Sequence, residues 1–255
     1  MRGLKSAIFV FCAFAVSPGA FASTITIYSG IDSNVGAAST LTNSNAAHAA
    51  FTTGSAPMGD SALITFESAP LGNFTSLALG SGATLTLSNT LAGTFDNPGI
   101  TNATDAFLGF NTTAGGAKFF RMATNFIGHG ATTNATATFS FASPIDAFGG
   151  YFTGLGGGGD TVSLNFVDGS SETLNLSDTS ACNNPSCAEF FGFTDAGAQI
   201  SSIVLNMAYT NQESSGTFGY FIGVDDVQFS TVPEPASLLL FGSGIAVLAR
   251  RRRHS

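Results

Sequence analysis

Carboxylates in an early and in a late segment of the chain are the side chains whose placement best suits chemistry. Glu67 closes the run Ile64–Glu67, and Asp225 and Asp226 lie within the run Gly223–Phe229. Two acids brought together by a fold are what glycoside hydrolysis requires, one as a proton donor and the other as a base or nucleophile. The structural alternative is that these acids are only exposed positions on an edge strand.

A glycosidase normally also needs a cleft lined with aromatic platforms. The chain has no tryptophan, and its four tyrosines are widely separated in the sequence: Tyr28, Tyr151, Tyr209 and Tyr220. Their rings could stack on a sugar, but no sequence feature places them together. We therefore expect no enzyme and assign no catalytic residue, and a hydrolase of matrix polymers is kept as an alternative.

The two acidic segments resemble those of extracellular jelly-roll carbohydrate-binding modules, whose last strand carries acids before an apolar pair. In those modules an acid from an early strand and one from the last strand hold a structural calcium ion, which prefers several hard oxygen ligands. The resemblance implies Glu67, with Asp225 or Asp226, as calcium ligands, and no other cofactor is expected. It also makes a specific carbohydrate-binding module a second alternative function.

Cysteine and histidine suggest little further chemistry. Cys182 and Cys187 enclose an Asn-Asn-Pro-Ser stretch typical of a turn, and in an oxidising compartment they predict a local disulfide. A metal or redox pair is less favoured, because the spacing is not Cys-x-x-Cys and no histidine lies nearby. His48 and His129 are expected to be solvated rather than catalytic.

A β domain must position these groups. Residues 23–231 are rich in Thr, Ser, Asn, Gly and Phe, and short alternating runs lie between turn residues. This pattern predicts one all-β domain, an antiparallel, jelly-roll-like β-sandwich. The clearest hairpin joins Val162–Val167 to Ser171–Leu176 through the Asp168-Gly169 turn. The other expected strands are Ile25–Tyr28, Leu63–Glu67, Thr84–Leu87, Phe119–Met122, Thr136–Phe141, Ala147–Phe152, Ser202–Met207 and Phe218–Phe229, the last with a bulge near Gly223.

One segment of this domain predicts a helix instead. Ser44–Phe51 is rich in alanine, which favours helix, and Ser44 is a suitable N-cap residue. Gly54 can end the helix. We expect one short surface helix here, packed against the domain through Phe51.

The last residues of the chain follow a different pattern. Pro233 and Pro235 fix φ and remove two backbone donors, which predicts an extended or turn-like segment. The uncharged run Ala236–Ala249 would be about 21 Å long as a helix, whereas a full membrane span needs about 20 residues. The arginines of Arg250–Arg253 suit a membrane boundary with the charges on the cytoplasmic side. A buried C-terminal helix of the domain is the alternative.

This order of parts resembles the PEP-CTERM sorting domain of Gram-negative bacteria, over residues 232–255. The matching segments are Val232–Leu238, Gly242–Leu248 and the arginine cluster. The resemblance implies cleavage by an exosortase and a host that exports extracellular polysaccharide. It also implies transient inner-membrane anchoring through residues 236–249. The implied sorting and processing residues are Pro233, Glu234, Pro235, Arg250, Arg251, Arg252 and Arg253.

The N-terminus reads as a secretory signal peptide over residues 1–22. Arg2 and Lys5 form a basic start, an apolar helical stretch follows, and Ala20 and Ala22 are the small residues of a cleavage site. A transmembrane anchor is the alternative, but the apolar stretch is short and ends in Pro18-Gly19. We therefore expect export by the Sec machinery and cleavage after Ala22.

Removal of both ends exposes a strongly acidic domain. Residues 23–231 keep two basic residues, Lys118 and Arg121, against fifteen acidic ones, for a net charge near −13. Such a surface repels nucleic acid and anionic lipid headgroups. The sequence thus predicts an exported structural or adhesive protein of the cell surface or extracellular matrix, associated with exopolysaccharide or biofilm.

Overall fold

The computed structural model describes residues 24–88, 98–105, 108–124, 130, 132–155, 160–176, 187–210 and 220–232. Within them, twelve strands and one helix are defined. In chain order these are β1 (Ile25–Ser33), α1 (Thr42–Ser55), β2 (Asp60–Ile64), β3 (Ser76–Gly80), β4 (Ala83–Ser88), β5 (Gly99–Thr101), β6 (Phe119–Ala123), β7 (Thr132–Leu155), β8 (Thr161–Phe166), β9 (Ser171–Asn175), β10 (Cys187–Asp195), β11 (Ile200–Thr210) and β12 (Phe221–Thr231).

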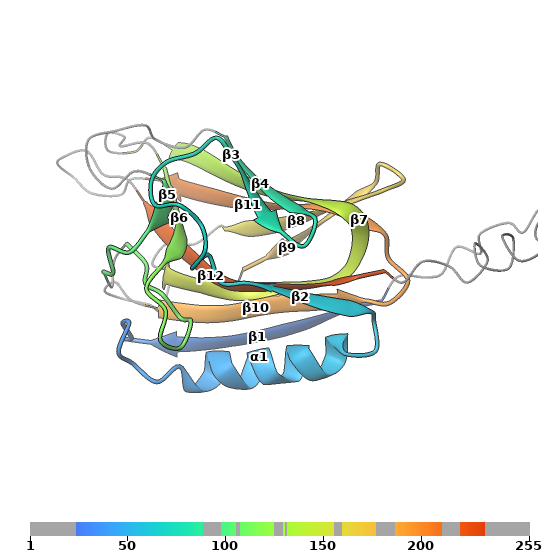
Figure 1. The fold of residues 1–255 in the computed structure, drawn as a ribbon, viewed down its shortest axis with the longest axis horizontal. Helices are drawn as coiled ribbons and strands as arrows, with labels where there is room; N and C mark the ends of the chain where they lie inside the picture. The colour runs from blue at the N-terminus through green and yellow to red at the C-terminus, as the bar shows by residue number, and fades with distance from the viewer. Residues whose placement is uncertain are drawn as a thin grey trace, which may run out of the picture.

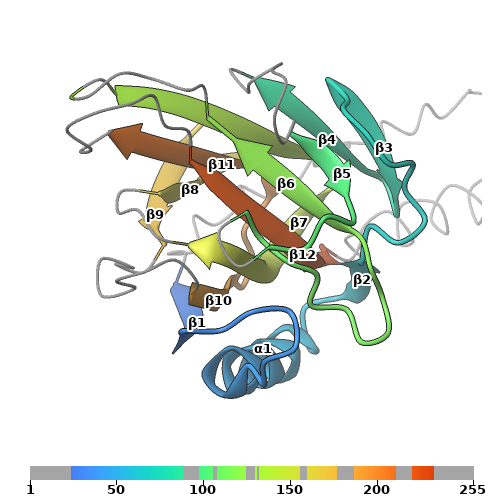
Figure 2. The ribbon, with the colours of Figure 1, turned by 90° about the vertical axis from the view of Figure 1, so that its left-hand side faces the viewer.

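The described strands pair only in antiparallel fashion and form two facing layers (Figures 1 and 2). One layer has the order β3-β4-β7-β11-β8-β9. The other has the order β1-β10-β7-β12, with β2 and β6 along the far side of β12 and β5 beyond β6. The predicted all-β antiparallel sandwich with one helix is confirmed.

Strand β7 belongs to both layers, because it bends from one into the other. Phe139 pairs with Ile203 of the first layer, whereas Phe148 pairs with Phe193 and Phe229 of the second. The sequence predicted two separate strands here. Pro144 lies at the bend, where its missing N–H breaks no ladder and its carbonyl accepts a hydrogen bond from the Val232 amide at 2.9 Å.

Phenylalanine rings fill the space between the two layers. Phe139 and Phe148 have ring centroids 5.5 Å apart, and Phe141 lies 4.9 Å from Phe229. Phe148 is 1 % exposed and Phe139 is fully buried. Each fully buried ring stabilises the fold by roughly 1.5–3 kcal/mol, so aromatic packing contributes substantially to the association of the two layers.

Strand β10 is buried along its whole length, because helix α1 covers its outer face. A strand buried on both faces lacks the alternation that sequence reading relies on, and β10 was missed for that reason. Gly192 lets α1 approach closely: a Cβ at this position would meet the Phe51 ring at 2.9 Å. Phe51 itself is fully buried, as predicted.

The helix is longer than the sequence indicated and begins differently. It runs over Thr42–Ser55 instead of Ser44–Phe51, and Ser44 lies inside its first turn. The capping acceptor is Asp32 of β1, which accepts hydrogen bonds from the Asn43 and Ser44 amides at 3.0 and 2.9 Å. The Ser44 N-cap prediction is therefore wrong, because a residue distant in sequence supplies the cap.

The predicted hairpin is confirmed, with Val162 opposite Leu174. Its loop is longer than predicted, because the Phe166 amide bonds to the Ser170 carbonyl and Gly169 adopts φ +87° inside the loop. Strands β3 and β5 were missed as well. The bulge in β12 falls between Asp225 and Gln228 rather than near Gly223.

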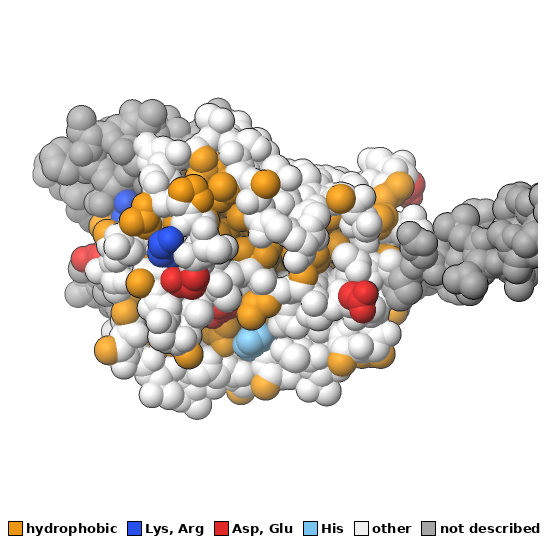
Figure 3. All heavy atoms as spheres, viewed as in Figure 1, with side chains coloured by type: hydrophobic (Ala, Val, Ile, Leu, Met, Phe, Trp, Pro, Cys, Tyr) orange, Lys and Arg blue, Asp and Glu red, His pale blue; other side chains and the backbone are white. Residues whose placement is uncertain are grey.

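A pocket of about 300 Å³, lined by both apolar and polar residues, lies between β2 and β3. Leu63, Pro70 and Leu79 line it, and Leu63 is 55 % exposed. Figure 3 shows apolar side chains along this side of a surface that is otherwise largely neutral and polar.

Candidate functional site

The three acids singled out in the sequence meet around one loop, residues 110–118. Glu67 follows β2, and Asp225 and Asp226 lie in β12. The Asn111 side-chain amide joins the two groups, because its Nδ2 donates to Glu67 Oε1 at 2.9 Å and to Asp225 Oδ2 at 3.0 Å. The sequence thus identified residues that the fold brings together, although it missed Asn111.

Backbone amides of the same loop complete the arrangement. The Lys118 amide donates to Glu67 Oε1 at 2.9 Å, and the Thr112 amide donates to Asp225 Oδ2 at 2.7 Å. The Thr113 hydroxyl donates to Asp226 Oδ1 at 2.6 Å. These carboxylates therefore shape the loop by accepting hydrogen bonds from it, and charge-assisted bonds of this kind are among the stronger ones in proteins.

Asp225 is the most deeply placed of the three, with an exposed fraction of 0 %. Burial, followed by the adjacent charge of Asp226, raises the pKa of Asp225 to about 7, although amide hydrogen bonds act in the opposite direction. Its Oδ1 is buried without a hydrogen-bond partner. Asp226 adopts φ +46° at the bulge, so the chain is strained where it turns the two acids toward the loop.

The calcium prediction depends on what these oxygens can still bind. In the described part of the chain, no group of three or more His, Cys, Asp or Glu side chains is arranged to hold a metal ion. Glu67 Oε1 and Asp225 Oδ2 already face N–H donors, which compete with a cation, whereas Asp225 Oδ1 is a hard oxygen with no partner. A calcium ion bound by Glu67, Asp225 and Asp226 stays a prediction.

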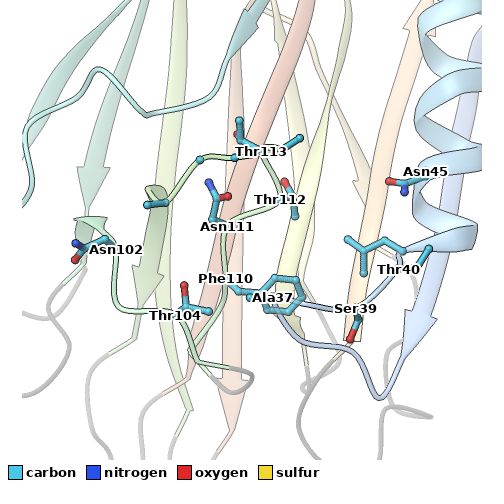
Figure 4. A pocket seen from close by; sticks show the side chains of 15 residues that line it. Ala37, Ser39, Thr40, Asn45, Asn102, Thr104, Phe110, Asn111, Thr112 and Thr113 are labelled. Atoms are coloured by element: carbon cyan, nitrogen blue, oxygen red, sulfur yellow. The ribbon is translucent and has the colours of Figure 1, made fainter.

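A cavity of about 580 Å³ lies beside this acidic group, between the loop that leads into α1 and the loops around Asn102 and Asn111 (Figure 4). The fifteen described residues that line it include no Asp, Glu, Lys, Arg or His. Eight of them carry a hydroxyl or an amide: Ser39, Thr40, Asn45, Asn102, Thr104, Asn111, Thr112 and Thr113. The cavity is therefore polar but uncharged.

The described tyrosines do not form sugar-stacking platforms. Tyr151 and Tyr220 are only 4 % and 8 % exposed, and Tyr28 packs edge-on against Phe51. Burial also raises the pKa of Tyr151 to about 12, with smaller contributions from the charges of Asp226 and Asp32. The Tyr209 side chain lies outside the described part of the structure.

His48 is partly exposed, and its side chain also makes contacts that the sequence did not suggest. Its Nδ1 lies 3.2 Å from the Tyr151 hydroxyl and its Nε2 lies 3.1 Å from Gln228 Oε1. Its ring stacks on Phe190 with centroids 4.9 Å apart. His48 therefore links α1 to the sheet through hydrogen bonds and packing. His129 lies outside the described residues.

Cys187 is disulfide-bonded and fully buried at the start of β10. Cys182 lies outside the described residues, so the pairing with Cys187 stays a prediction.

The predictions for the two ends of the chain fall outside the described residues. They are the sorting residues (Pro233, Glu234, Pro235 and Arg250–Arg253), the signal-peptide residues Ala20 and Ala22, and both predicted terminal helices. No helix within the described ranges is long and apolar enough to span a membrane.

The loop and helix residues that the sequence reading missed are Asn111, Thr112 and Asn45. Their only sequence signal is an Asn-Thr-Thr run in a Gly-rich loop and an asparagine within an alanine-rich helix. Such patterns are typical of ordinary surface loops and helices. Only the approach of the two segments in space gives them a shared role.

Comparison with known proteins adds one finding about sorting. A family model described as the PEP-CTERM protein-sorting motif matches residues 231–253. No curated protein sequence matches the chain. Among solved structures, the K2 cleaved adhesin domain of Lys-gingipain aligns with 67 % of this chain and 98 % of its own, at 16 % identity and a TM-score of 0.35, a likeness too low to carry an argument. The chain thus carries a PEP-CTERM protein-sorting motif at its C-terminal end, consistent with an exosortase substrate.

Proposed function

We propose that this chain is an exported, exosortase-processed protein of the cell surface or extracellular matrix, with a structural or adhesive role in association with exopolysaccharide. The observation that carries the proposal is the sorting motif at residues 231–253. In this proposal Sec export precedes transient retention in the inner membrane, and exosortase cleavage then releases the β domain outside the cell.

The position of the motif relative to the fold supports the cleavage step of this proposal. The last strand, β12, ends at Thr231, which pairs with Asp60 and Ile145. The Val232 amide makes one further bond, to the Pro144 carbonyl. Every described strand pairing therefore lies upstream of the Pro-Glu-Pro segment, so cleavage at or beyond it would leave the described sheet complete.

A non-catalytic role is part of the proposal. The Glu67 and Asp225 carboxylates accept several backbone amide bonds, and Asp225 is fully buried. A general acid or base must instead reach its substrate within hydrogen-bond distance. We expect no turnover across ester and glycoside panels, and hydrolysis that is lost on Glu67→Gln would overturn this part.

The sorting part is tested in a host that contains an exosortase. Glu234→Ala and deletion of Arg250–Arg253 should each leave an unprocessed or misplaced precursor, read by intact-mass analysis and cell fractionation. Glu172→Gln, at an exposed position of β9, serves as the control and should mature normally. Normal maturation of both tail variants would refute the sorting role. Failure of the mature protein to co-fractionate with matrix polysaccharide would refute the matrix association.

A further inference from the structure

We propose that the uncharged cavity beside α1 binds one or a few units of a neutral saccharide, held mainly by Asn45 and Asn111. This inference deepens the proposed function and rests on its matrix location. At about 580 Å³ the cavity falls within the usual range for small-molecule sites. Its described lining comes from residues 37–45, from Asn102 and Thr104, and from residues 110–117, which come together only in the fold.

The chemistry of the lining selects the ligand class. No described lining side chain is charged, and the carboxylates behind the wall would repel an anion, so an anionic ligand would find no counter-charge in the cavity. An apolar ligand would leave the lining hydroxyls and amides unpaired, which is unfavourable. A ligand rich in neutral hydroxyls satisfies the lining, because each hydroxyl both donates and accepts. Phe110 also lines the cavity, but its side chain is only 1 % exposed, so hydrogen bonding rather than ring stacking would hold the ligand.

Asn111 is held in one orientation before any ligand arrives. Its Nδ2 faces three acceptors, namely Glu67 Oε1, Asp225 Oδ2 and the Lys118 carbonyl at 2.7 Å. Since only the amide nitrogen can donate to these atoms, Oδ1 is the atom left to accept a hydrogen bond from a ligand. The acidic group therefore acts behind the cavity wall and positions the residue that would contact the ligand.

Asn45 presents the complementary group from helix α1. Its Oδ1 accepts a hydrogen bond from the Tyr151 hydroxyl at 2.7 Å, which leaves Nδ2 as a donor. Figure 4 shows Asn45 and Asn111 on opposite sides of the cavity. Asn111 offers a hydrogen-bond acceptor on one side of the cavity and Asn45 offers a donor on the other, which suits the hydroxyl groups of a sugar ring. Because both side chains are held in place before binding, less conformational entropy is lost when the ligand binds.

The test measures saccharide binding to the mature exported protein by glycan array and then by isothermal titration calorimetry. The probes are neutral gluco-, manno- and galacto-oligosaccharides, with oligogalacturonides as the charged comparison. Asn45→Ala and Asn111→Ala each remove one proposed contact, and Ala37→Phe fills the cavity without removing a side-chain hydrogen bond. Asn134→Ala, an exposed asparagine on β7 away from the cavity, is the matched control. Thermal melts of each variant verify that it is folded.

We expect millimolar or tighter binding of at least one neutral class, weakened tenfold or more by Asn45→Ala, Asn111→Ala and Ala37→Phe and unchanged by Asn134→Ala. Absence of neutral-saccharide binding at millimolar concentration would overturn the inference. So would binding that Asn45→Ala and Ala37→Phe leave intact, or stronger binding of the oligogalacturonides. Processing and fractionation are read separately, so a correctly sorted protein without saccharide binding would refute this inference alone.

Discussion

Asp160 offers a quantitative test of how this fold tolerates its buried acids. The side chain is 4 % exposed. Its described hydrogen bonds come from the Ala208 amide at 3.2 Å and the Tyr220 hydroxyl at 3.3 Å. Burial raises the pKa of Asp160 from 3.8 to about 7, and the two hydrogen bonds offset only part of that effect.

The sign of the pH dependence follows from this raised pKa. The folded protein keeps the Asp160 proton to a higher pH than the unfolded chain does, so stability falls as pH rises between about 4 and 7. From pH 5 to pH 8 this residue alone should lower the unfolding free energy by about 3 kcal/mol, at roughly 1.4 kcal/mol per pKa unit. Asp160→Asn removes the ionisation and keeps a carbonyl acceptor.

The assay is urea unfolding of the mature exported protein at pH 5, 6, 7 and 8. The difference in unfolding free energy between Asp160→Asn and the wild type should shift in favour of the variant by about 3 kcal/mol over this range. Asp146 and Asp225 titrate in both proteins and cancel in the difference. Glu172→Gln, exposed on β9, should show no such trend. A difference between Asp160→Asn and wild type that stays constant with pH would refute the burial argument.

Three further predictions concern packing, capping and metal. Gly192→Ala should destabilise the protein by about 1–3 kcal/mol in urea unfolding, because the new methyl group would press on the Phe51 ring. The control is Gly36→Ala, which should be close to neutral because a Cβ there meets nothing within 4 Å. Equal effects of the two substitutions would contradict the close packing at Gly192. Asp32→Ala should lower stability by about 1–2 kcal/mol through loss of the α1 cap. Burial alone would raise the pKa of Asp32, but the hydrogen bonds from Asn43 and Ser44 lower it overall. The stabilisation by the Asp32 cap should therefore be present above about pH 4 and fade below it. A loss of stability in Asp32→Ala that does not change with pH would argue against a carboxylate cap. A calcium ion at the acidic loop predicts a higher melting temperature in CaCl₂ than in EDTA and loss of that difference in Asp225→Asn, whereas identical melts would remove the metal site.

Local patterns were enough for several features of this protein. Alternation in Val162–Phe166 and the turn at Gly169 predicted the hairpin, because each depends on neighbours a few residues away. The proline, apolar and arginine segments of the tail identified the sorting motif for the same reason. Acids at Glu67 and Asp225 were flagged by residue type, and the fold does bring them together.

The tertiary structure alone decided the features that depend on contacts between distant segments. β10 carries no alternation, because α1 covers one face and the first layer covers the other. Asp32 caps a helix that starts ten residues later, and no local pattern marks that pairing. Asn45 and Asn111 became a facing pair only because α1 and the 110–118 loop lie against the same sheet. A sequence read in short windows records which side chains are available, whereas burial and long-range hydrogen bonds decide which of them share a site.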